Sequence, residues 1–197
     1  APDLCKHTGA RFIGSRDACN VARAAGLPES QLVETAGRED IVSGPGVVRG
    51  LPSAHGRVYF NRVAVAGNIE EPPPWPARYT ELKHGLVLNW YLDLGGVRVV
   101  HIDSAEFFDV ELAGMECDVL CLCAIGRKYR PGYTEDAIRL LKPKVVLPCH
   151  WDLFTTPIEE EPFLIPQVDL EGFLGEIHAT GTPSVVLPML GSYGFKR

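Results

Sequence analysis

Short apolar runs alternate with amphipathic stretches along the chain, and this alternation restricts its fold more than any other feature. Strand-like runs and helix-like stretches of this kind are typical of an α/β protein. The strands are expected at residues 10–14, 47–54, 58–66, 86–94, 97–103, 119–123 and 144–149. Helices are expected after the capping residue Ser15, at 135–141 after the capping residue Thr134, and near 170–178. Without a linker or an internal repeat, we expect one domain over residues 1–197.

Composition narrows the class of protein. With 46% hydrophobic residues the chain can build a core, and its net charge of −6 without a basic run predicts no nucleic-acid partner. The apolar runs are too short to span a bilayer, so no membrane partner is expected. Six cysteines and no signal-peptide pattern favour a reducing compartment, and we expect a cytoplasmic protein.

Two segments leave alternatives open. The C-x3-C-x-C run of Cys117, Cys121 and Cys123 reads as buried structural thiols, with metal or redox use as the alternative. The Glu-Pro-Pro-Pro-Trp-Pro segment at 71–76 must be an extended loop, because its prolines cannot donate ladder hydrogen bonds. It is either a rigid connector or a loop that covers a substrate.

Three polar residues stand where apolar runs end: His55, Asp103 and His150. In α/β sheets the crevice beyond the carboxyl ends of the strands is the usual ligand site. Neutral imidazoles and a carboxylate suit zinc, manganese or ferrous iron. Each residue alone is ordinary as a cap or a hydrogen-bonded structural group, and it is their joint occurrence that predicts a metal site.

The order of these motifs resembles the metallo-β-lactamase fold, and most closely its ascorbate-6-phosphate lactonase-like branch. The matching segments are Pro-Ser-Ala-His ending at His55, Asp-Ser at Asp103, and Pro-Cys-His-Trp-Asp around His150. The resemblance implies an αββα sandwich. It also implies that His55 binds the first metal, Asp103 bridges two divalent ions, either zinc or manganese, and His150 binds the second. Catalysis would then fall to Asp103 and His150 in a hydrolase that uses a metal-activated water on a lactone, amide or phosphoester.

One departure from this family is large. Its H-x-H-x-D-H motif is absent, since the six histidines are His7, His55, His84, His101, His150 and His178. We therefore expect the chain to lack the N-terminal strands of the sandwich and a companion segment to carry that motif. The alternative is a non-catalytic binding or scaffold protein that kept the fold and lost the metals. A small-molecule substrate is expected, and association into a homo-oligomer stays open.

Further candidates surround this set. Asp152 is interpreted as a residue that orients a ligand or as a turn cap, and His84 as a substrate contact or a surface histidine. His101 shares the strand face of Asp103. Arg127, with Lys128 and Arg130, is a candidate anion site or a solvated basic turn. Trp75, Tyr79 and Trp151 are candidates to line a pocket or to cover core. Serine catalysis at Ser104 lacks a nucleophile elbow, and thiol catalysis at Cys149 puts the thiol and His150 on opposite faces.

Overall fold

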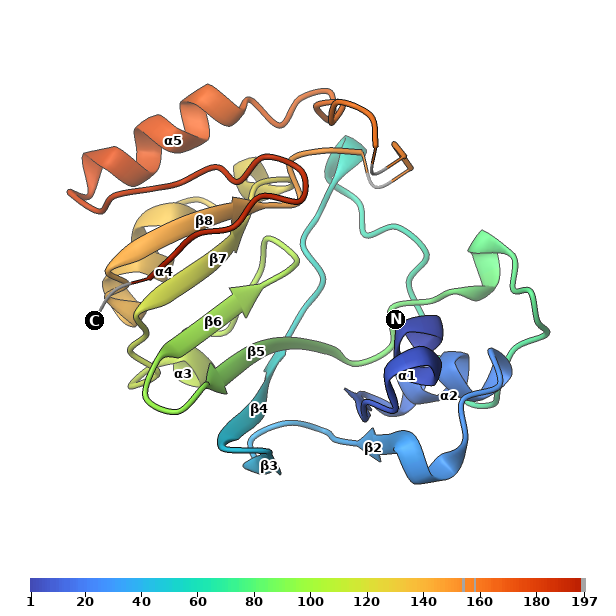
Figure 1. Cartoon of the computed structure of the whole chain (residues 1–197). Helices are drawn as coiled ribbons and strands as arrows, with labels where there is room; N and C mark the ends of the chain where they lie inside the picture. The colour runs from blue at the N-terminus through green and yellow to red at the C-terminus, as the bar shows by residue number, and fades with distance from the viewer. Residues whose placement is uncertain (154, 158, 196–197) are drawn as a thin grey trace.

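A mixed six-stranded sheet forms the body of the molecule (Figure 1), in a computed structural model that describes residues 1–153, 155–157 and 159–195. Its strands are β3 (Ile41–Ser43), β4 (Gly46–Ser53), β5 (Val87–Asp93), β6 (Arg98–Ile102), β7 (Val119–Cys123) and β8 (Val145–Cys149), paired in that order. The pairs from β3 to β6 are antiparallel, and those from β6 to β8 are parallel. Consequently β4, β6, β7 and β8 all run in one direction, and their carboxyl ends meet at one edge.

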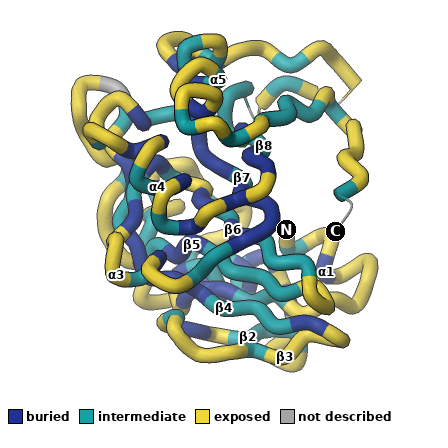
Figure 2. The backbone as a smooth tube through the Cα atoms, turned by 90° about the vertical axis from the view of Figure 1, so that its left-hand side faces the viewer, coloured by how far each residue is buried: buried dark blue, intermediate teal, exposed yellow. Residues whose placement is uncertain are grey.

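Three helices cover one face of this sheet: α3 (Asp109–Leu112), α4 (Tyr133–Leu141) and α5 (Leu170–Ala179). Figure 2 shows buried positions concentrated in β7 and β8. A single buried cluster joins sheet to helices and includes Val100, Ile102, Leu120, Leu122 and Val146 on the strands and Leu112, Leu141, Phe173 and Ile177 on the helices. Each such side chain contributes roughly 1.5–3 kcal/mol through burial, which fixes the carboxyl ends of the strands on a rigid frame.

The other face of the sheet is less covered. Because strand side chains alternate, Trp90, Leu92, Val99 and Leu147 point away from the buried cluster. These four apolar residues are only half-buried.

A smaller unit precedes the sheet. It holds α1 (Pro2–Thr8), β1 (Phe12–Gly14), α2 (Arg16–Ala24) and β2 (Leu32–Glu34), with β1 and β2 parallel. Ser15 caps α2 as expected, because its Oγ accepts from the Ala18 amide at 3.3 Å. The remaining elements are short 3-10 turns: η1 (Glu29–Gln31), η2 (Tyr59–Asn61), η3 (Tyr79–Glu81) and η4 (Arg127–Tyr129).

The α/β class is confirmed, and two local expectations are wrong. Residues 58–66 form no strand; this stretch contains η2, and only an isolated bridge joins Val58 and Arg62. Thr134 does not cap α4, because Gly132 occupies the N-cap position and the Thr134 hydroxyl donates instead to Glu176 at 2.7 Å. Beside the six-stranded sheet, the described residues hold one two-stranded sheet, formed by β1 and β2. No helix in these ranges is long and apolar enough to cross a membrane.

Candidate metal centre

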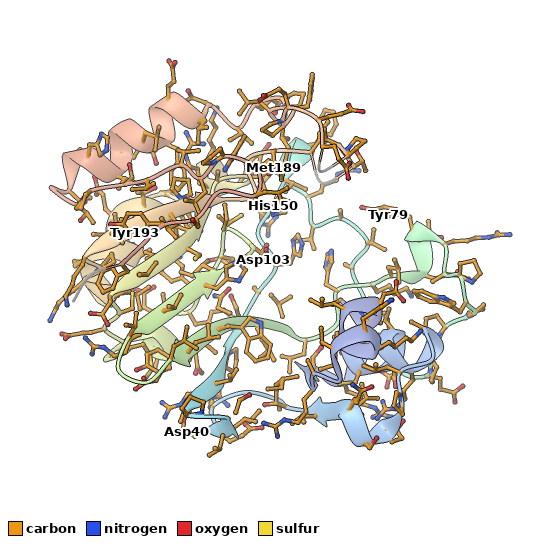
Figure 3. All side chains as sticks on the ribbon, viewed as in Figure 1. Asp40, Tyr79, Asp103, His150, Met189 and Tyr193 are labelled. Carbon is orange, nitrogen blue, oxygen red and sulfur yellow. The ribbon has the colours of Figure 1, made fainter. Side chains whose placement is uncertain are left out.

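The three residues expected to bind metal line a single cavity of about 410 Å³. His55 follows β4, Asp103 follows β6 and His150 follows β8, so each stands at the shared carboxyl edge of the sheet. Figure 3 shows Asp103 and His150 close together beyond the ends of their strands. The three residues therefore line one cavity, as the shared direction of their strands predicts.

The loop of His55 is attached to the loop of Asp103. The Gly56 amide donates to the Ser104 hydroxyl at 2.7 Å, and the Ser53 hydroxyl donates to the Glu106 carbonyl at 2.9 Å. A Cβ added to Gly56 would lie 2.8 Å from the Ala105 amide nitrogen, so this close approach requires glycine. Sequence reasoning considered Ser104 only as a nucleophile; its position next to Asp103 was the available signal of a supporting role.

Backbone carbonyls orient both imidazoles in the same way. His55 Nδ1 lies 2.7 Å from the Gly56 carbonyl oxygen, and His150 Nδ1 lies 3.2 Å from the Asp103 carbonyl oxygen. A proton on Nδ1 donated to the carbonyl puts the lone pair on Nε2, which is the arrangement that histidine ligands of metals commonly show. His150 also has a positive φ of 52°, a costly backbone conformation that clusters at functional sites.

Two further histidines, His101 and His84, contact the proposed ligands. His101 Nε2 lies 4.0 Å from the Asp103 carboxylate, in agreement with the shared strand face. Burial lowers the pKa of His101, although Asp103 opposes the shift. His84 also lines the cavity and stacks directly on His55. Burial, with a smaller effect of His55, lowers the pKa of His84, so this ring stays neutral at neutral pH.

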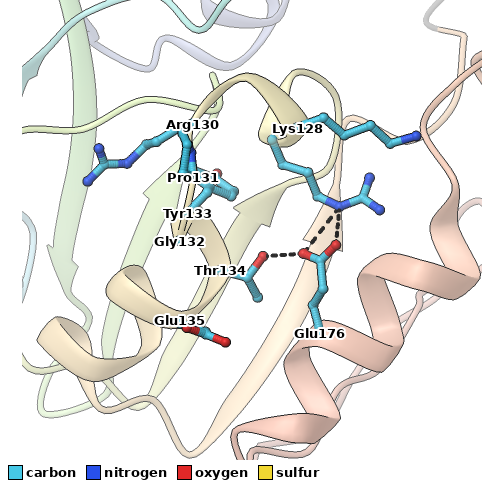
Figure 4. Close-up of a pocket in the computed structure, with 9 residues that line it drawn as sticks. Lys128, Arg130, Pro131, Gly132, Tyr133, Thr134, Glu135 and Glu176 are labelled. Atoms are coloured by element: carbon cyan, nitrogen blue, oxygen red, sulfur yellow. Dashed lines mark hydrogen bonds and ion pairs between the residues drawn. The ribbon is translucent and has the colours of Figure 1, made fainter.

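Asp152 and Arg127 do not join this cavity. The backbone of Asp152 is bridged to Leu164. Arg127 lines a separate cavity of about 280 Å³ beside α5, shown in Figure 4. It is 4% exposed, and its guanidinium pairs with Glu176 at 3.1 Å and with Asp169 at 3.4 Å. Arg127 is therefore not a solvated basic turn, because its guanidinium is buried and paired with two carboxylates. An anion site formed by Arg127, Lys128 and Arg130, which all line this cavity, stays a prediction.

The cysteines behave as packing residues. No disulfide links any of the six thiols, all of which lie in the described ranges. Burial raises the pKa of Cys117 to about 12 and also raises the pKa of Cys123 and Cys149. A buried protonated thiol is a poor nucleophile and a poor metal ligand, which argues against catalysis by Cys149.

The donor chemistry fits a divalent metal ion, but the number of donors does not suffice. Two imidazoles with oriented Nε2 atoms and an exposed carboxylate are ligands that zinc and manganese accept. However, within residues 1–153, 155–157 and 159–195 no three His, Cys, Asp or Glu side chains are close enough to hold an ion together. His55, Asp103 and His150 therefore do not form a metal site by themselves, and their role as ligands stays a prediction.

Comparisons with known proteins point to one fold. No family model matches the chain. It is 31% identical over 164 residues to a UPF0173 metal-dependent hydrolase of Pyrobaculum arsenaticum, covering 81% of this chain and 62% of the relative. A second UPF0173 metal-dependent hydrolase, from Thermus thermophilus, is 37% identical over 81 residues, covering 39% of this chain and 35% of the relative. The chain thus spans less than two thirds of the length of these relatives.

A solved structure shows which fold the chain has. The metallo-β-lactamase fold protein YhfI from Bacillus subtilis superimposes with a TM-score of 0.53 at 11% identity. The match covers 96% of this chain and 67% of that chain.

Proposed function

We propose that this chain, which has the metallo-β-lactamase fold, forms the His55, Asp103 and His150 part of a metal-dependent hydrolase. The observation that carries the proposal is the single cavity that these three residues share, although they follow three different strands. The two UPF0173 relatives, which are named metal-dependent hydrolases, support it. The substrate is proposed to be a small molecule with a lactone, amide or phosphoester bond.

The proposed cofactor is a pair of divalent ions, either zinc or manganese, held in part by His55, Asp103 and His150. Such ions lower the pKa of water and stabilise developing negative charge. This chain's own residues would orient the donors: Gly56 and Asp103 hold the two Nδ1 atoms through their carbonyls.

The remaining ligands are proposed to come from a companion segment that carries H-x-H-x-D-H. Two observations favour this partner. Within the described residues, no three His, Cys, Asp or Glu side chains could hold an ion together. The half-buried Trp90, Leu92 and Val99 also form an apolar sheet face that a second layer of strands would cover.

Analysis of the protein as it occurs in its source cells tests the proposal. Intact mass and N-terminal sequencing are expected to reveal the companion segment, and metal analysis is expected to give about two ions per assembled protein. Hydrolysis of lactone, amide and phosphoester panels should be lost in His150→Ala and Asp103→Asn. It should persist in the control His178→Ala, because His178 is exposed and Ser184 is the partner of its side chain among the described contacts.

The opposite result has a clear meaning. If no companion is found and no metal binds after supplementation, the chain is a scaffold that kept the fold without the chemistry, and the hydrolase proposal is wrong.

A further inference from the structure

A second cavity of about 370 Å³ adjoins the candidate metal centre. It shares His55, His84, Ser104 and His150 with the first cavity. Its other lining residues are Val58, Ala64, Val65, Tyr79, Leu82, Ile125, Leu153 and Ile165. A ligand whose reacting bond lies beside His150 can therefore extend into this space.

The chemistry of the second cavity differs from that of the first. Among the described residues, no lysine, arginine, aspartate or glutamate lines it, and apart from the shared residues Tyr79 is the one of them with a polar side-chain group. Away from the shared histidines and Ser104, a phosphate or sugar would lose its hydration and find only the Tyr79 hydroxyl among the described lining residues, at a cost of several kcal/mol. An apolar group gains roughly 25 cal/mol for each Å² that it buries.

Backbone hydrogen bonds hold the inner wall of this cavity in place. Ile165 is 4% exposed, and its amide donates to the Trp151 carbonyl at 3.0 Å. The Leu153 amide donates to the Phe163 carbonyl at 2.8 Å, so the segment after β8 folds back on itself. A preformed wall of this kind is usual for small-molecule sites.

The outer rim comes from the segment between β4 and β5. Tyr79 on η3 is 68% exposed and Leu82 is also exposed, yet both line the cavity. Exposed apolar side chains gathered at the mouth of a cavity mark a binding site more often than a plain surface. The Pro-rich segment 71–76 lies in the same connection, just before η3.

We infer that this cavity receives an apolar acyl or aryl group of the substrate, while the bond to be cleaved lies beside Asp103 and His150. The inference rests on the proposed function and narrows it: the bond cleaved is an amide or a carboxylic ester, of which a lactone is the cyclic form, and it carries an apolar acyl or aryl part. Polar phosphosugars are excluded from this part of the site.

Binding to the full chain without added metal tests the inference separately from catalysis. The probes are octanamide and acetamide, neutral amides that differ only in alkyl length, followed by calorimetry and by methyl NMR. Octanamide is expected to bind and to shift the methyl signals of Ile125, Leu153 and Ile165, whereas acetamide does not.

Two matched variants sharpen the result. Leu82→Asp places a charge at the rim and should weaken octanamide binding by about tenfold or more. Leu94→Asp changes an exposed leucine in the turn between β5 and β6 and should leave binding unchanged. Equal binding of both amides, or equal binding by Leu82→Asp and the unmodified chain, would overturn the inference.

Activity of the native assembly separates this inference from the proposed function. Hydrolysis without any preference for octanoyl over acetyl esters would contradict the apolar site and leave the hydrolase standing. Octanamide binding without hydrolysis by the metal-loaded assembly would support the apolar site and contradict the hydrolase.

Discussion

His55 and His84 stack face to face, with ring centroids 3.8 Å apart and ring planes inclined by 15°. In the sequence, His55 precedes the Pro-rich segment 71–76 and His84 follows it. The stack therefore brings the two ends of a long loop together at the candidate metal centre. His55 is thus oriented from two directions: the Gly56 carbonyl holds its Nδ1 atom, and His84 fixes the plane of its ring.

This stack predicts a specific order of metal affinities. If the proposed metal centre is correct, His84→Ala should weaken zinc binding by the protein from its source cells about ten- to a hundredfold, because groups that orient a ligand have effects of this size. His84→Phe keeps a flat ring against His55 and should retain most of the affinity. Competition with a chromophoric chelator measures the affinities, and thermal unfolding checks that both variants fold. Equal affinity of the alanine and phenylalanine variants would contradict a role for stacking.

Gly56 supports the same histidine through the close approach of two loops. Gly56→Ala should lower the free energy of unfolding by about 1–3 kcal/mol, because the new methyl group overlaps the Ala105 backbone. The control is Gly175→Ala in α5, where a Cβ meets nothing within 4 Å. There the change should stabilise the helix by about 0.5–1 kcal/mol. Urea denaturation of the two variants measures both effects, and similar values for the pair would refute the loop contact.

The sequence could predict this site because it depends on strand ends. His55, Asp103 and His150 each follow an apolar run, and the shared direction of β4, β6 and β8 brings those ends together. The stack of His84 on His55 could not be predicted, because the connecting residues 58–84 lack periodicity and part of them was read as a strand. The burial of Arg127 could not be predicted from the sequence either, because its partners Asp169 and Glu176 are distant in the chain.

Asp17 anchors both ends of the Pro-rich connection. Its carboxylate accepts from the Ile69 amide at 2.5 Å and from the Leu86 amide at 3.2 Å, and a Cβ on Gly85 would collide with it. Asp17→Ala leaves two amides without their acceptor and should cost about 1–3 kcal/mol of unfolding free energy. Limited proteolysis should then cut within residues 70–85 faster than in the control Asp3→Ala, whose side chain is exposed. Equal cleavage rates would show that Asp17 does not hold this loop.

Asp118 predicts how stability responds to acid. Its carboxylate accepts from the Arg98 amide at 2.9 Å and pairs with Lys144 at 2.9 Å. The Arg98 amide, followed by Lys144, lowers the pKa of Asp118 below its usual 3.8. Because the folded pKa is the lower one, the charged form stabilises the fold. This contribution is complete above the unfolded pKa and is lost as pH falls through the folded pKa.

Asp118→Asn tests the direction in which stability changes with pH. At pH 7 the variant should be less stable than the unmodified chain by about 1–3 kcal/mol, because the acceptor of the Arg98 amide becomes neutral and the ion pair with Lys144 is lost. The difference should shrink below about pH 4 and vanish once Asp118 is protonated in both states. Urea denaturation from pH 7 to pH 2 measures this difference in unfolding free energy. The control Glu160→Gln changes an exposed residue and should alter neither the unfolding free energy nor its dependence on pH. A difference that stays constant down to pH 2 would mean that Asp118 acts through its shape and not through its charge.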